Sequence, residues 1–251
     1  MDELEHVSPT GRKYSSVIGY IQSTLSYALF NIVHPFVIIT SSACLLIACW
    51  KYGLSHLYSW HVLLTGLAYH LLMASGIVVL NGNNSLTRLK RHSTRRMIHL
   101  VLQCVASGAV LAGCVLQYVS REIKGKPHLV SVHSVTGTIS AIFVITTLVI
   151  GLIILLSGQG QDSCMRPSLS KRLHRISGLT SFLAGTIAVV LSYNKHTFTE
   201  HFSTEICFML KCFAVTNALL SLFGMLRNMY QFILEWFEFA MGNPDGSSSR
   251  R

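Results

Sequence analysis

Charged residues are scarce in this chain, and acidic ones are the scarcest. Asp, Glu, Lys and Arg make up 12% of its 251 residues, hydrophobic residues make up 51%, and the mean hydropathy is +0.49. Soluble globular domains carry about 25% charged residues. The composition therefore excludes an ordinary soluble domain and predicts a polytopic membrane protein.

Two further features are missing. No Cys-x-x-Cys motif occurs, and six of the seven cysteines lie in or beside apolar stretches, which favours free thiols packed between helices over a disulfide framework. The first five residues include three acidic ones and no cation, so the cationic segment of a signal peptide is lacking. We therefore expect the N-terminus to be retained.

The formal net charge of +10 is compatible with nucleic-acid binding, but the position of the charges is not. The basic residues lie in short connections between apolar stretches and do not gather on one face or helix. Membrane topology and anionic lipid headgroups explain such a distribution better. We expect a lipid bilayer as partner and no nucleic acid.

Six apolar stretches are long enough to cross a bilayer, for which about 20 residues suffice. They predict an all-α protein with membrane spans at about 25–49, 60–80, 97–119, 129–156, 173–193 and 206–226. Residues 25–226 thus form one six-helix domain between cytosolic tails at 1–24 and 227–251. We expect Pro35 to kink the first span, Lys211 to snorkel from the sixth, and 230–239 to form an interfacial helix.

The distribution of Lys and Arg orients the spans. The connections between spans two and three and between spans four and five carry five and four of these residues, while the other three carry one, three and one. The positive-inside rule places the richer connections, and with them both termini, in the cytosol.

Four histidines lie close to the starts of predicted spans, where an ionisable side chain is costly unless it is used. With alternating span directions, His61 and His133 lie at the non-cytosolic face, and His99 and His174 at the cytosolic face. Much of a hydrocarbon core of about 30 Å separates the two levels. The pattern predicts two stacked sites of two histidines each.

Two histidines per level suit haem better than a bare metal ion. Zinc takes three or four protein ligands, whereas haem iron needs only two axial side chains. Small residues follow three of the histidines at same-face helical spacing, namely Gly66, Gly137 and Gly178, which would let a flat macrocycle approach. His99 is followed by Gln103 instead. We predict a central four-helix bundle that binds two haems.

The four histidines lie within the segments 57–61, 97–103, 126–134 and 173–178, with the sequences LYSWH, MIHLVLQ, KPHLVSVHS and LHRISG. These segments resemble the ligand motifs of the cytochrome b561 family, and most closely its domain-containing type 2 branch. The resemblance covers residues 55–193 in the family's order and spacing. It implies two haem b groups, with His99 and His174 as axial ligands of the inner one and His61 and His133 of the outer one.

The resemblance also implies an activity. Cytosolic ascorbate would give one electron to the inner haem, which would pass it to the outer haem, and monodehydroascorbate or ferric iron would be the acceptor. It further implies a homodimer in endoplasmic reticulum or vesicle membranes.

Cations near each level are candidate binding residues. At the inner level, haem propionates or ascorbate would be held by Arg95, Arg96 and Arg175. At the outer level, an anion or a chelated ferric ion would be steered by Lys126, His128 and Lys195. Topology alone also explains these charges.

Two further histidines, His34 and His70, lie inside predicted spans. Each either makes a hydrogen-bonded contact between helices or has a role in tuning a haem or relaying a proton. The alternative function is a proton- or metal-coupled transporter that uses intramembrane histidines. Histidines at helix ends in two levels, without apparent inverted repeats, speak against that alternative. A purely structural membrane protein is a third, poorer interpretation.

Overall fold

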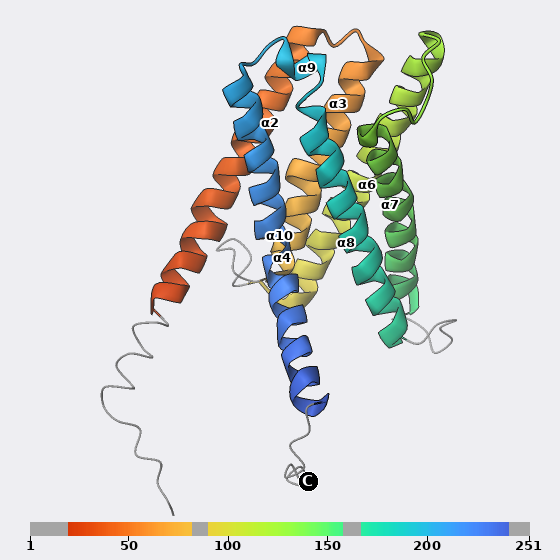
Figure 1. The fold of residues 1–251 in the computed structure, drawn as a ribbon. Coiled ribbons are helices and arrows are strands. Elements are labelled where there is room, and N and C mark those ends of the chain that lie inside the picture. The colour runs from red at the N-terminus through yellow and green to blue at the C-terminus, as the bar shows by residue number, and fades with distance from the viewer. Residues whose placement is uncertain (1–19, 82–89, 158–166, 241–251) are drawn as a thin grey trace, which may run out of the picture.

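The computed structural model describes residues 20–81, 90–157 and 167–240. Within these ranges all regular structure is helical. Figure 1 shows long helices side by side, with the first described residues and the end of the last helix at the same end of the bundle. An even number of crossings produces this arrangement.

The six predicted spans are confirmed as six helices long and apolar enough to cross a membrane. Each has at least 21 residues, which exceeds the length that a bilayer core requires. They are Tyr20–Tyr52, Leu57–Leu80, His92–Ile123, Val132–Leu156, Leu169–Ser192 and Thr204–Gly224.

The first span stays helical through Pro35. Proline lacks the backbone N–H that an α-helix uses, and the turn before it is the π-helix η1 (Leu29–Val33), which leads into α2 (His34–Tyr52). At the site of the expected kink, the helix therefore widens locally and continues.

The second span also contains a π-helix. It consists of α3 (Leu57–Leu67), η2 (Ala68–Met73) and α4 (Ala74–Asn81). A π-helical turn accommodates an extra residue in a helix and often marks a functional position.

Two antiparallel hairpins form the centre of the molecule. In the first, α3 and α4 pack along α6 (His92–Ile123), and in the second α7 (Val132–Ser157) packs along α8 (Pro167–Ser192). Contacts of α6 with α7 and of α8 with η2 join the hairpins into the predicted four-helix bundle.

Two helices cover this bundle from one side. The final helix, α10 (Thr204–Ala240), contacts α2, α4 and α8, and α2 also packs on α3. The short α9 (His196–Thr199) joins α8 to α10. Serines recur at the buried positions of these spans, including Ser41, Ser59, Ser140, Ser181 and Ser221. Small polar residues of this kind let membrane helices approach closely.

Some predicted boundaries shift. The fourth span begins at Val132 and not near 129, because Leu129 has a positive φ of 54° that interrupts helix formation. The helix expected over 230–239 is present as the continuation of the sixth span, since α10 runs unbroken to Ala240, and its interfacial position stays a prediction. Lys211 reaches toward the helix end as expected, where its Nζ donates a hydrogen bond to Asn194 Oδ1 over 2.7 Å.

Candidate functional site

The structure brings the four helix-start histidines together in two pairs. The ring centroids of His61 and His133 are 6.4 Å apart, and those of His99 and His174 are 6.3 Å apart. Metal–imidazole bonds are about 2 Å long, so two imidazoles on opposite sides of one metal ion have centroids roughly 6 Å apart. Each pair is therefore spaced to share one metal ion.

The same hydrogen bond fixes the tautomer of every ring. Nδ1 of His61 lies 2.9 Å from the carbonyl oxygen of Gly113, and Nδ1 of His99 lies 2.7 Å from the carbonyl oxygen of Gly76. The corresponding distances are 2.8 Å from His133 to Ala188 and 3.2 Å from His174 to Thr147.

A carbonyl oxygen only accepts hydrogen bonds, so each Nδ1 carries the proton. Nε2 of each neutral ring then keeps its lone pair for a metal ion. Orientation of a ligating histidine through its other nitrogen is the usual arrangement around protein-bound metals.

These hydrogen bonds run in both directions within each hairpin. His61 on α3 bonds to α6, and His99 on α6 bonds back to α4. His133 on α7 and His174 on α8 are related in the same way. Every helix of the bundle thus supplies one ligand at one level and one orienting carbonyl at the other.

The spacing along each helix fixes the distance between the levels. Fourteen residues separate His99 from Gly113, His133 from Thr147 and His174 from Ala188. This corresponds to about 21 Å at 1.5 Å per residue. From His61 to Gly76 there are fifteen residues, and the π-helix η2 lies between them. The extra residue is therefore accommodated in the π-helix, which keeps both ends of the span in register.

The donor set suits a macrocyclic metal cofactor. Among the described residues, no group of three or more His, Cys, Asp and Glu side chains converges on one point. Two imidazoles alone do not complete the shell of a bare zinc ion. They do complete that of an iron whose four equatorial ligands come from a porphyrin.

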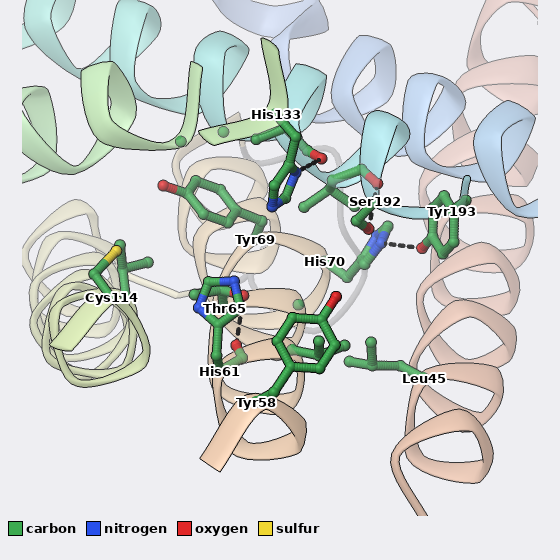
Figure 2. Close-up of a pocket in the computed structure, with 17 residues that line it drawn as sticks. Leu45, Tyr58, His61, Thr65, Tyr69, His70, Cys114, His133, Ser192 and Tyr193 are labelled. Atoms are coloured by element: carbon green, nitrogen blue, oxygen red, sulfur yellow. Dashed lines mark hydrogen bonds between the residues drawn. The ribbon is translucent and has the colours of Figure 1, made fainter. Parts of the chain in front are cut away.

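A pocket opens between His61 and His133 (Figure 2). Its empty volume is about 630 Å³, including its mouth. Gly66 and Gly137, the small residues that follow these histidines, both line it. A Cβ at Gly66 would lie 2.6 Å from Leu45 Cδ2, so a side chain there would crowd the pocket wall.

The supporting residues at the inner level differ. Gly178 faces Thr147, whose carbonyl orients His174, so its small size serves the approach of α7 and α8. Gln103 donates from Nε2 to the Met73 carbonyl oxygen over 3.2 Å and lies against Gly76. It thus holds together the two helices that position His99.

The candidate inner cations differ in burial and in contacts. Arg95 is half-buried, donates from Nη1 to the Leu80 carbonyl over 3.3 Å, and has a buried Nε without a partner among the described residues. Arg175 is exposed and close enough to His174 to interact with its ring electrostatically. Arg96 is exposed.

The outer candidates are spread over two connections. Lys195 precedes α9 and acts electrostatically on His133. His128 stacks on Tyr118 at 4.6 Å between ring centroids, and its Nε2 lies 2.7 Å from Glu122 Oε1. Lys126 is exposed in the same connection.

Sequence reasoning missed several residues of the outer pocket. Tyr69 lies across the bundle, with its ring against Gly185 and its hydroxyl hydrogen-bonded to Ser140. Tyr193, which was also missed, lies with its phenol oxygen 2.6 Å from Nε2 of His70, one of the two histidines expected inside spans. A polar side chain inside an apolar span was the available signal.

Comparisons with known proteins find relatives of this chain. Residues 60–199 match the eukaryotic cytochrome b561 family. The chain is also 29% identical over 153 residues to the transmembrane reductase CYB561D2 of Homo sapiens, Mus musculus and Bos taurus. That match covers 58% of this chain and 64% of each relative, so it spans less than two thirds of their length.

No solved structure matches the chain significantly. The matched region 60–199 contains all four paired histidines and more than half of the 251 residues. The chain belongs to the eukaryotic cytochrome b561 family.

Proposed function

We propose that the protein is a transmembrane oxidoreductase with two haem b groups that moves single electrons across the membrane. The donor is cytosolic ascorbate, and the acceptor on the other side is monodehydroascorbate or ferric iron. The observation that carries this proposal is the pairing of four imidazoles whose Nδ1 atoms are all hydrogen-bonded to backbone carbonyls.

The family binds haem b, and the protein's own residues fit that cofactor. When bound, haem supplies a one-electron ferric–ferrous couple. His61 with His133, and His99 with His174, would each hold one haem, and an iron held by two imidazoles would favour electron transfer over oxygen chemistry. The hydrogen-bonded rings on rigid helices would keep their orientation in both oxidation states.

The depth of the two pairs supports transfer across the membrane. Their separation of about 21 Å along the helices takes up most of a hydrocarbon core of about 30 Å. Each pair thus lies toward one edge, within reach of a water-soluble partner. A transporter path would need titratable groups in a continuous series from one face to the other, whereas the four paired histidines lie at two separate levels.

On the cytosolic side, Arg95, Arg96 and Arg175 are proposed to hold haem propionates or ascorbate. Arg95 is the strongest of the three, because its buried Nε lacks a partner among the described residues and an anionic oxygen would satisfy it. This orientation, with both termini in the cytosol, follows from the distribution of Lys and Arg.

On the opposite side, Lys126, His128 and Lys195 are proposed to attract the acceptor. Lys195 lies close enough to His133 to affect its ring electrostatically. A cation there favours approach of an anion or of an anionic ferric chelate. Family membership further suggests a homodimer in endoplasmic reticulum or vesicle membranes.

The decisive experiment is haem quantification and absorption spectroscopy of detergent-purified protein, before and after ascorbate, for the wild type, His61→Ala and His99→Ala. We expect two ascorbate-reducible b-type haems per chain and the loss of about one in each variant. His196→Ala is the matched control, because its side chain is 87% exposed. A colourless wild type from haem-replete cells would contradict the proposal and make ion or proton flux the next assay.

A further inference from the structure

A cluster of buried polar residues lies beside the outer pocket and takes no part in ligation. His70 and Tyr193 are hydrogen-bonded, and Asn217 Nδ2 donates to the His70 carbonyl oxygen over 3.0 Å. His34 Nε2 lies 3.4 Å from Ser221 Oγ, which in turn donates to the Asn217 carbonyl. Each of these five residues is at most 3% exposed. Burial of so many polar groups in a membrane span is costly unless they serve a function.

Both histidines of the cluster are associated with π-helical turns. His70 lies within η2, and His34 directly follows η1. In η2 the consecutive residues Tyr69 and His70 are both buried, the first reaching toward α7 and α8 and the second toward Tyr193 and α10. The π-helix thus lets one span contribute adjacent side chains to two different contacts.

One polar atom of the cluster lacks a well-formed hydrogen bond. Asn217 Oδ1 is buried and makes no hydrogen bond of good geometry within the described part of the chain, although the His34 ring lies close enough to interact with the Asn217 side chain. It belongs to a residue that lines a small, partly open cavity together with Tyr69, His70, Thr186, Val189 and Ala214, with room of about 10 Å³ for the centre of a water-sized sphere. One water molecule needs roughly 10–15 Å³ by this measure, so the cavity is about the size of a single water.

The cavity adjoins the outer pocket. Tyr69, His70 and Val189 line both spaces, so the cavity lies next to the pocket between His61 and His133, of which Figure 2 shows the wall with Tyr69 and His70. His70 is therefore the one imidazole, beside the Tyr69 phenol, that lines both the cavity and the proposed site of the outer haem.

Few other titratable groups face His70. Among the described residues, they are the phenols of Tyr69 and Tyr193, His34 on α2, which interacts with Asn217, and the thiols of Cys44 and Cys207 near Tyr193. The outer pocket adds Tyr58, His61, Cys114 and His133. The span 57–80 contains no Asp, Glu, Lys or Arg, and Lys211 on α10 is bonded to Asn194. A charge that appears at the outer level has no fixed counter-charge in this cluster.

We propose that His70 and the water-sized cavity at Asn217 form a proton site linked to the outer haem. This inference rests on the function proposed above. When one electron arrives at the outer level, one proton from the aqueous phase, relayed by water at Asn217 Oδ1, binds the neutral His70 imidazole. When the acceptor takes the electron, the proton is released. A positive charge beside an added negative one is favourable because the surrounding dielectric is low.

The test is the pH dependence of the two midpoint potentials, measured spectroelectrochemically on the full-length di-haem protein. We expect the midpoint potential of the outer haem to change by about 59 mV per pH unit over part of the pH range, which is a tenfold change in its redox equilibrium. The midpoint potential of the inner haem should show no such slope. His70→Gln, which retains a side chain able to bond Tyr193, should abolish the slope while both haems remain bound. His196→Ala should leave it unchanged.

Infrared difference spectroscopy gives a readout that does not depend on turnover. Reduction of the outer haem should shift the Tyr193 phenol band in the wild type, and less in Asn217→Leu, which removes the water-binding oxygen at similar volume. Tyr193→Phe identifies the phenol band. If His70→Gln does not fold, Tyr193→Phe also tests the inference, because it should shift the pH range over which the outer midpoint potential depends on pH. A wild type with two haems and a pH-independent outer potential, or an unchanged slope in His70→Gln, would overturn the inference alone. Absence of haem would overturn the proposed function.

Discussion

The outer and inner histidine pairs share their ligand geometry but differ in their surroundings. Ring separations of 6.4 and 6.3 Å and four Nδ1–carbonyl hydrogen bonds make them nearly equivalent as ligands. The outer pair faces an enclosed pocket with His70 and Tyr193 in its wall, whereas the inner pair lies near arginines. The pairing of the histidines therefore follows from the helix repeat, and differences between the two levels come from the side chains around them.

The largest effect is expected from removal of an axial ligand at one level only. His133→Gly should lose the outer haem and keep the inner one, and His174→Gly should do the reverse. Added imidazole should restore the missing haem in each case, since it replaces the deleted ligand without a change in the backbone. Absorption spectra with and without imidazole check this, and loss of both haems in either variant would argue against independent levels.

A side chain at Gly185 should damage the outer site selectively. Its Cβ would collide with the Tyr69 ring, so Gly185→Ala should displace that ring into the outer pocket at a cost of roughly 1–3 kcal/mol. The expected result is weaker haem retention at the outer level and a lower thermal midpoint. Gly108→Ala is the matched control, because nothing lies within 4 Å of that Cβ. Equal loss in both variants would mean that helix propensity, and not the Tyr69 contact, is responsible.

Removal of one positive charge at either membrane face should change the kinetics of the substrate on that face only. Arg95→Gln removes a charged donor, and charge-assisted hydrogen bonds contribute roughly 1.5–3 kcal/mol, so the KM for ascorbate should rise about tenfold or more. Lys195→Gln should leave that KM unchanged and slow the reduction of an anionic ferric chelate at low salt. Steady-state kinetics in sided vesicles provide the measurement. Reversed effects of the two variants would reverse the proposed orientation.

The smallest effect is expected at Gln103. Gln103→Leu removes one hydrogen bond to the Met73 carbonyl, a loss of roughly 0.5–1.5 kcal/mol. Haem should be retained at both levels, with faster haem loss from the inner one. Haem transfer to an excess of apomyoglobin measures this rate. A faster loss from the outer level would contradict the local role of this residue.

The parts of the fold that depend on helix period and hydropathy could be predicted from the sequence. Six spans follow from apolar length, and the division of the four histidines into two levels follows from alternating span direction. The packing partners could not be predicted in this way. Two of these features join segments that are distant in the sequence, namely the contact of Tyr69 with Gly185 and the hydrogen bond between His70 and Tyr193. A third, the extra residue accommodated by η2, depends on side-chain fit. Local sequence patterns do not encode such long-range complementarity.

The central claim is that both histidine pairs bind haem iron from two sides. Electron paramagnetic resonance of the oxidised, purified wild type tests it most directly, because six-coordinate bis-imidazole iron is low-spin. The account predicts two low-spin ferric signals, one lost in His133→Gly and the other in His174→Gly. A single signal, or a high-spin signal from five-coordinate iron at either level, would contradict it.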